Sequence, residues 1–95
     1  MVKAATTVRE RIEQLLTSLR ADWERLPTVE AEIGGWDLLD QLTFVEEWPL
    51  VEQKLDELAR YADEGQLTPA QAARYRGLLD VVERNRPIIQ RLRES

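Results

Sequence analysis

Residues 8–26 read VRERIEQLLTSLRADWERL, and this stretch decides the fold class. Its large apolar residues recur at steps of three or four, and Leu16 widens the stripe that they form: Val8, Ile12, Leu15, Leu19, Trp23 and Leu26. Such steps put these side chains on one face of an α-helix, opposite a polar face. The residue before a proline avoids helical backbone angles, so Pro27 should end this helix. The sequence therefore predicts a first helix over about residues 4–26.

A second helix is predicted over about residues 36–47, after a structured connection at 27–35 that Gly34-Gly35 closes. Its aliphatic residues are expected to point inward: Leu38, Leu39, Leu42 and Val45. Phe44 falls on the face opposite this line. Two aspartates, Asp37 and Asp40, lie in the first turns, where the positive end of the helix dipole favours them.

Pro49 leaves two alternatives open for the middle of the chain. A proline cannot donate a hydrogen bond to the carbonyl four residues earlier, and inside a helix it costs about 3 kcal/mol. Yet the apolar rhythm continues beyond it: Val51, Leu55, Leu58 and Ala62. Either a new helix starts at Pro49, or one long helix kinks there. We favour a break or a sharp kink, which predicts a further helix over about residues 49–64 that Gly65 ends.

The strongest start signal is the segment Thr68-Pro69-Ala70-Gln71. Threonine at the N-cap, proline at the first helical position and glutamine at the third form a capping box. This predicts a helix over about residues 69–86. Pro87 then either kinks that helix or starts a short last one over residues 87–93. Asn85 is interpreted as the cap of such a last helix, or as a buried residue that sets register in an oligomer.

These patterns predict an all-α fold in a single domain, residues 1–95. The chain has three helical arms, the middle one interrupted, which would pack as an antiparallel bundle of three to five helices. The longest stretch without a charged residue, residues 65–73, is far too short to cross a bilayer. Because it also lacks cysteine, the chain is expected to be cytoplasmic, with no membrane contact.

Charge is distributed unevenly over a net charge of −5. Residues 28–65 hold eleven acidic against two basic side chains, whereas residues 66–95 hold six arginines against three acids. Nucleic-acid binding needs clustered lysine and arginine, so the acidic middle excludes it as an expected activity. The basic end is interpreted as packing beside the acidic middle.

Most catalytic and metal chemistry is excluded by composition. The chain has neither histidine nor cysteine, which removes disulfides, ordinary zinc sites, thiol nucleophiles and histidine acid–base catalysis. The glycine pair Gly34-Gly35 stands alone and is no phosphate-binding loop. We therefore expect no catalytic residue, no cofactor and no metal.

An interaction surface is the remaining hypothesis. Phe44 and Trp48 lie beside acidic residues at the predicted helix break, and aromatic anchors with a charged rim are typical of interfaces. The candidate interface comprises the aromatic pair and nearby acids: Phe44, Glu46, Glu47, Trp48, Glu52 and Asp56. The acidic arm would attract a basic protein partner.

We therefore expect a non-enzymatic protein–protein interaction module: a homodimer, an inhibitor or antitoxin-like regulator, or an accessory subunit. A line of small residues, Ala70, Ala73 and Gly77, would let a second helix approach and supports the homodimer. The alternative is a small helical enzyme or ligand carrier that binds an anionic molecule between helices. Its candidate residues are two arginine pairs, Arg9 with Arg11 and Arg74 with Arg76, although residues two apart diverge around a helix.

Overall fold

The computed structural model describes residues 7–94, in which every regular element is helical. The elements are α1 (Val8–Glu24), α2 (Leu26–Glu32), the short 3₁₀ helix η1 (Ile33–Gly35), α3 (Leu38–Asp63) and α4 (Pro69–Glu94). The prediction of an all-α fold is confirmed. Residues 4–6, where the first helix was predicted to begin, lie outside the described residues.

The first arm bends where the sequence predicted an end. α1 stops at Glu24, the chain turns at Arg25, and α2 continues through residues expected to be a connection. Pro27 lies in the first turn of α2. Backbone N–H groups in the first turn have no acceptor within the helix, so a residue that lacks this group is tolerated there. The amide of Val29 donates to the carbonyl of Arg25 at 2.9 Å, so helical hydrogen bonding resumes at once.

Both long helices run through their prolines. α3 contains Pro49 and α4 contains Pro87, so the favoured helix end at residue 47 is wrong, and at both prolines the alternative of one continuous helix is observed. Each proline leaves one carbonyl, four residues earlier, without its helical donor. Both prolines are exposed, so water can reach the unpaired carbonyls and the helices tolerate them. Packing on either side then outweighs the local preference for a break.

The turn between α3 and α4 follows its sequence closely. Gly65 has a φ of 74°, and the amides of Gly65 and Gln66 donate to the carbonyls of Ala62 and Tyr61. This pair of bonds is a Schellman motif, so the prediction that Gly65 ends the helix is confirmed. The capping box is present as well: the Gln71 amide donates to Thr68 Oγ1 at 3.1 Å, and the Thr68 amide donates to Gln71 Oε1 at 3.0 Å.

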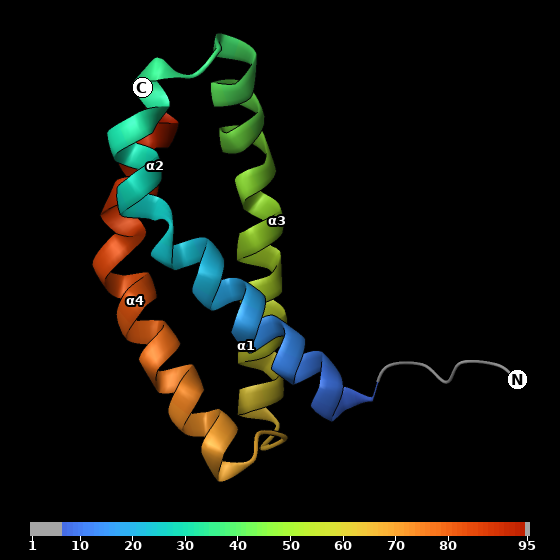
Figure 1. Cartoon of the computed structure of the whole chain (residues 1–95). Helices are drawn as coiled ribbons and strands as arrows, with labels where there is room; N and C mark the ends of the chain where they lie inside the picture. Colours follow the sequence, from blue (N-terminus) through green and yellow to red (C-terminus); the bar gives the residue numbers. More distant parts are fainter. Residues whose placement is uncertain (1–6, 95) are drawn as a thin grey trace, which may run out of the picture.

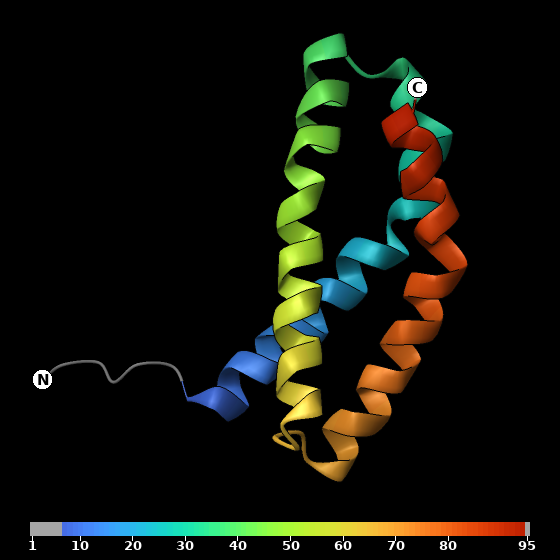
Figure 2. The same cartoon turned by 180° about the vertical axis from the view of Figure 1, so that it is seen from behind.

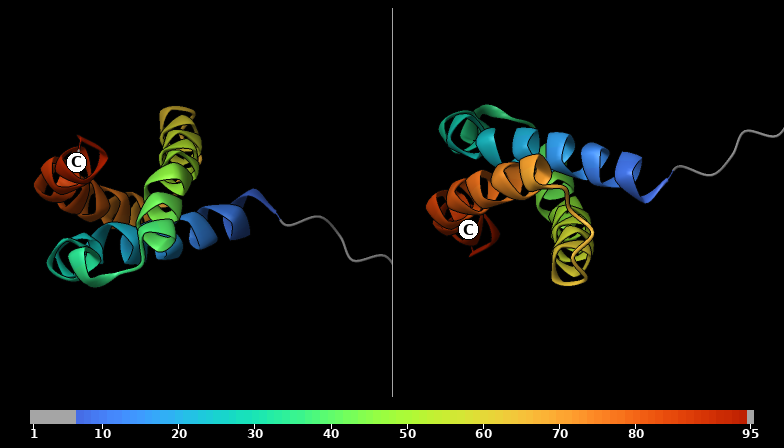
Figure 3. Two further views of the ribbon diagram at one scale, coloured as in Figure 1. Left: turned by 90° about the horizontal axis from the view of Figure 1, so that it is seen from above. Right: turned by 90° about the horizontal axis from the view of Figure 1, so that it is seen from below.

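The helices form two layers. α3 and α4 run antiparallel, meet at the Gly65 turn and diverge from it (Figure 1), and the reverse view shows the same opening (Figure 2). α1 crosses both of them diagonally and packs against each, whereas α3 and α4 touch each other little. Views along the long axis place α1 and α2 on one side of the α3–α4 pair (Figure 3). α2 lies along the C-terminal part of α4, so the N-terminal part of α3 stands apart.

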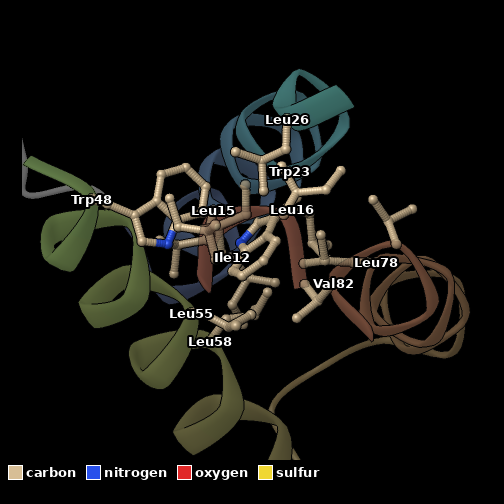
Figure 4. Close-up of a cluster of buried hydrophobic side chains, with 14 residues drawn as sticks. Ile12, Leu15, Leu16, Trp23, Leu26, Trp48, Leu55, Leu58, Leu78 and Val82 are labelled. Atoms are coloured by element: carbon tan, nitrogen blue, oxygen red, sulfur yellow. The ribbon is translucent and has the colours of Figure 1, made fainter. Parts of the chain in front are cut away.

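The core gathers where α1 crosses the other helices (Figure 4). α1 and α4 supply most of it, through residues such as Leu15, Leu19 and Val81. From α3 the buried side chains are only Trp48, Leu55 and Leu58. None of the ten residues of α3 before Trp48 is buried. No helix within residues 7–94 is both long enough and apolar enough to cross a membrane.

Candidate interaction surface

The first half of α3 carries the predicted interface residues, but the structure divides them. Trp48 is buried, with 3% of its surface exposed, and Phe44 is half-buried. Three of the acids, Glu46, Glu47 and Asp56, are exposed. The expectation that Trp48 is an exposed anchor is therefore wrong. The acidic residues lie on the surface as predicted, and their use in binding stays a prediction.

Trp48 is one member of a chain of aromatic rings. Its ring centroid lies 4.9 Å from that of Trp23 in an edge-to-face contact, and 5.8 Å from that of Phe44. Phe44 in turn meets Trp36 at 6.0 Å. Figure 4 shows Trp48 pointing from α3 into the cluster around Trp23. This chain of rings ties the segment before α3, and α3 itself, to the end of α1.

Glu52 is also bound by other side chains of the molecule. Its Oε2 accepts a hydrogen bond from Trp48 Nε1 at 3.0 Å and lies 3.1 Å from Arg86 Nη1. The Arg86 guanidinium also stands over the Trp23 ring, 5.1 Å from its centroid. These contacts join α3, α4 and α1 at one point. Asn85, the residue before Arg86, donates from Nδ2 to the carbonyl of Trp23 at 2.9 Å and so holds the end of α1. Within the described structure Asn85 is not the cap of a separate last helix.

Ion pairs join different helices, and two of them, Arg86–Glu52 and Arg91–Glu30, match the predicted pairing of the basic end with the acidic middle. The pairs are Arg11–Glu57, Arg74–Glu13, Arg86–Glu52 and Arg91–Glu30. The hydrogen bond from Arg11 lowers the pKa of Glu57, and that from Arg91 lowers the pKa of Glu30. These contacts neutralise some carboxylates of residues 28–65 and leave others without an ion pair.

Several acids of the acidic middle have no ion pair, and four of them lie at the start of α3 or on its first half. Asp37, Asp40, Glu46 and Glu47 form no ion pair with any other part of residues 7–94. The next basic residue along the chain is Lys54. This half of α3 is therefore a concentrated negative surface.

Exposed leucines share the same segment. Leu38 is 69% exposed, Leu39 72% and Leu42 48%, so the prediction that these residues point inward is wrong. α1 ends before it reaches them, and α2 packs on α4 instead. A groove of about 550 Å³ runs beside them, between η1, α3 and the end of α4. Its lining is mainly apolar: Ile33, Gly34, Leu38, Gln41, Leu42, Val45, Leu92 and Arg93.

One signal in the sequence could have shown which face of α3 is buried. Residues Phe44, Trp48, Val51, Leu55 and Leu58 follow one another at steps of four and three across Pro49. That is a single stripe on one helix, and it is the stripe that meets the core. Dividing the helix at Pro49 hid the stripe and made the leucines before it look like a separate core face.

The arginine pairs considered for an anionic ligand do not converge in the structure. Arg11 pairs with Glu57 and Arg74 pairs with Glu13, while Arg9 and Arg76 are exposed elsewhere. A shallow groove of about 260 Å³ between α1 and α4 does contain Arg74 together with Arg20. Both guanidiniums are already bound to glutamates there. No three acidic side chains of the described residues are grouped closely enough to hold a metal ion.

Comparison with known proteins gives no further guide, because no family model, no curated protein and no solved structure matches this chain. The geometry of the surface is therefore the basis for a function.

Proposed function

We propose that this chain is a small, non-enzymatic protein–protein interaction module whose binding surface is the first half of α3. The observation that carries the proposal is the exposure of Leu38 and Leu42, which line an apolar groove on a helical segment that contributes no buried residue. Single exposed leucines are ordinary, but several on one unpartnered helical segment beside an apolar groove are typical of an interaction site.

The uncompensated acids favour a basic protein as the partner. Asp37, Asp40, Glu46 and Glu47 would attract a cationic surface over several ångströms and raise its rate of association. The apolar contact from the leucines would then hold the complex. An inhibitor, a regulator or an accessory subunit would all work in this way. The predicted homodimer is a further form of the same proposal, with a second copy as the partner.

An enzyme or carrier of anionic ligands is the weaker reading. Arg11 and Arg74, which would bind an anion, are each engaged by a glutamate, so their positive charge is already compensated.

Affinity capture from the native cell tests the proposed function. The bait would be the full chain, compared with a Leu38→Gln/Leu42→Gln variant and a Leu39→Gln/Leu50→Gln control. Both variants keep the net charge and replace exposed leucines of the same helix by a good helix former. We expect a protein that the wild type retains and the Leu38/Leu42 variant loses. That protein is then purified, and its affinity for the three chains is measured directly.

The proposal fails if the three baits retain the same proteins with equal affinity. Substrate turnover or a tightly bound small molecule in the purified chain would favour the enzyme or carrier reading instead. Circular dichroism of each variant checks that helical content is unchanged, so that loss of binding reports on the surface.

A further inference from the structure

The first half of α3 has a second exposed side, away from the leucine groove, which is the groove lined by Leu38 and Leu42. Asp40, Phe44 and Glu47 follow one another at steps of four and three, so they share this second side of the helix. Two hollows lie along it. The first, of about 560 Å³, is at the start of α3, and the second, of about 150 Å³, lies where α3 meets the end of α1. No residue that lines either hollow also lines the leucine groove.

Acidic side chains dominate the lining of both hollows. Asp37 and Asp40 line the first, and Asp22 and Glu47 line the second, against one basic lining residue, Arg25. None of the four carboxylates forms an ion pair within residues 7–94. Asp37 is the N-cap residue of α3, yet its side chain makes no capping hydrogen bond. The helix N-terminus adds a positive charge of about one half, which is smaller than the two negative charges beside it. This side of α3 therefore attracts cations.

The spacing of the carboxylates indicates which kind of cation fits. No three acidic side chains of the described residues are grouped closely enough to hold a metal ion. Asp40 and Glu47 are seven residues apart, which is about 10 Å along a helix. Carboxylates spread in this way match several cationic groups on one polymer, such as the lysines or arginines of a protein. A second copy is the less suitable source of these groups, because the net charge of the chain is −5.

Aromatic rings give the hollows a surface for the apolar stems of such side chains. Trp36 lines the first hollow and Phe44 the second, both are half-buried, and their ring centroids are 6.0 Å apart in an edge-to-face contact. Lysine and arginine lay their stems on apolar surface, and a cation over an aromatic ring is attracted to it. Gln41 Nε2 donates to the carbonyl of Trp36 at 2.9 Å and so fixes the backbone beside the first hollow. The rings and the carboxylates are therefore in place before a partner binds.

We propose that this second side of α3, from Trp36 to Glu47, is the docking site for a segment of the partner protein that carries lysine or arginine. The proposal rests on the proposed function and adds where the positive charge of the partner binds. One basic side chain enters the hollow of Asp37 and Asp40 and packs on Trp36. Another reaches Glu47, two helical turns later. The leucine groove then remains the apolar contact of the proposed function.

Two short synthetic peptides test this inference on the full chain. One carries two lysines three residues apart, which is about 10 Å in an extended segment, and the other has glutamine in both places. Binding is followed by NMR of the isotope-labelled chain, and we expect only the lysine peptide to bind. The indole N–H signal of Trp36, identified with a Trp36→Phe variant, should shift more than that of the buried Trp23. Raising the salt concentration from about 0.05 to 0.5 M should weaken binding several-fold, because the screening length falls to about 4 Å.

Matched charge variants locate the bound peptide. Asp40→Asn/Glu47→Gln should weaken the lysine peptide about fivefold, as loss of two exposed ion pairs does. Glu46→Gln/Asp56→Asn is the control, because it removes the same charge from exposed positions of the same helix that line neither hollow. The control should change the affinity by less than about twofold, since salt screens the more distant charges. Circular dichroism of both variants checks that α3 is intact.

Leu38→Gln/Leu42→Gln distinguishes this inference from the proposed function. The variant should bind the lysine peptide as the wild type does, because these leucines line the other groove. Loss of the peptide in this variant would place it in the leucine groove and overturn the inference. Absence of binding, equal binding of the two peptides, or an equal loss of affinity in the two charge variants would overturn it as well. A dimer at low salt that only Asp40→Asn/Glu47→Gln dissociates would make a second copy the occupant. In each of these cases the proposed function would stand, because it fails only when captured partners ignore Leu38 and Leu42.

Discussion

The indole of Trp48 links the core of the molecule to its candidate binding surface. Its ring contacts Trp23 on one side and Phe44 on the other, and its N–H group donates to Glu52. Residues before it on α3 are exposed or half-buried, and buried positions begin with it. Trp48 therefore fixes the direction in which the first half of α3 leaves the core.

Replacing Trp48 should reduce stability. Trp48→Ala removes a large side chain that is 3% exposed, and truncations of this kind lower the free energy of unfolding by about 3 to 5 kcal/mol. Urea unfolding followed by circular dichroism measures the change. Leu50→Ala, two residues later and 56% exposed, is the control and should shift stability by less than about 0.5 kcal/mol. Equal stability of Trp48→Ala and the wild type would show that the indole is not part of the core.

Glu57 makes stability depend on pH. Arg11 donates two hydrogen bonds to it, at 2.9 and 2.8 Å, and the resulting charge-assisted pair lowers the pKa of Glu57 in the folded chain. A carboxyl group with a lowered folded pKa stabilises the fold above its unfolded pKa of about 4.3. That stabilisation is lost as the pH falls through the folded pKa. Stability should therefore decline below about pH 4.

Glu57→Gln tests this assignment. The variant should be less stable than the wild type by about 1 kcal/mol at pH 7, and the difference should vanish in acid, where the wild-type carboxyl is protonated. Urea unfolding at pH 7, 5 and 3 gives the comparison. Glu47→Gln is the matched control, because Glu47 forms no ion pair within the described residues. A difference between Glu57→Gln and the wild type that does not shrink between pH 7 and pH 3 would contradict the assignment.

α3 shows how far a sequence can predict its own fold. The helix ends that depend on local chemistry, at Gly65 and at Thr68, were predicted correctly because glycine and the capping box act within a few residues. The course of the helix through Pro49 was not, because it depends on what packs on both sides. Which stripe of α3 is buried depends on where α1 and α2 run, and the sequence indicates it only when the helix is taken as continuous through Pro49. On α3 the predicted anchor Trp48 is buried, and Leu38, Leu39 and Leu42, which were predicted to point inward, are exposed.

Removing the proline of α3 should stabilise the chain. In a continuous helix, Pro49→Ala restores the hydrogen bond to the carbonyl of Val45 and relieves the steric clash of the ring. The gain in the helix is partly offset because alanine leaves the unfolded chain more freedom, so we expect about 2 kcal/mol. Urea unfolding measures it, and Pro87→Ala in α4 should behave alike, since Pro87 is also exposed within a helix. Lower stability or reduced helicity of either variant would mean that the chain needs the prolines to break helices at these positions.

The whole molecule has one part held by ion pairs and a core, and another part whose apolar and acidic side chains are exposed. Interhelical ion pairs and the core hold α1, α4 and the second half of α3 together. The first half of α3 adds exposed leucines and uncompensated carboxylates at one end. Apolar surface favours association, and like charge opposes association between identical copies. The two features together are the reason for proposing a basic partner over a second copy at low salt.

The same balance predicts how self-association responds to salt. At about 0.05 M salt, repulsion between the carboxylates of two α3 helices should keep the isolated chain at the mass of one copy. At about 0.5 M the charges are screened over about 4 Å, and the leucines should then draw copies together. The homodimer predicted from the sequence is therefore expected to strengthen with salt. Light scattering at high micromolar concentration measures the mass.

The variants of α3 distinguish a dimer held by apolar contact from one held by opposite charges. Leu38→Gln/Leu42→Gln should abolish the rise in mass at high salt, because it removes the apolar contact. Leu39→Gln/Leu50→Gln should reduce this rise in mass less, since Leu39 and Leu50 lie outside the groove. A dimer that instead dissociates as salt is raised would have to be held by opposite charges, with the carboxylates of α3 in one copy against arginines of the other. That outcome would show that these carboxylates attract the chain's own arginines, and a basic partner protein would then compete with a second copy for one surface.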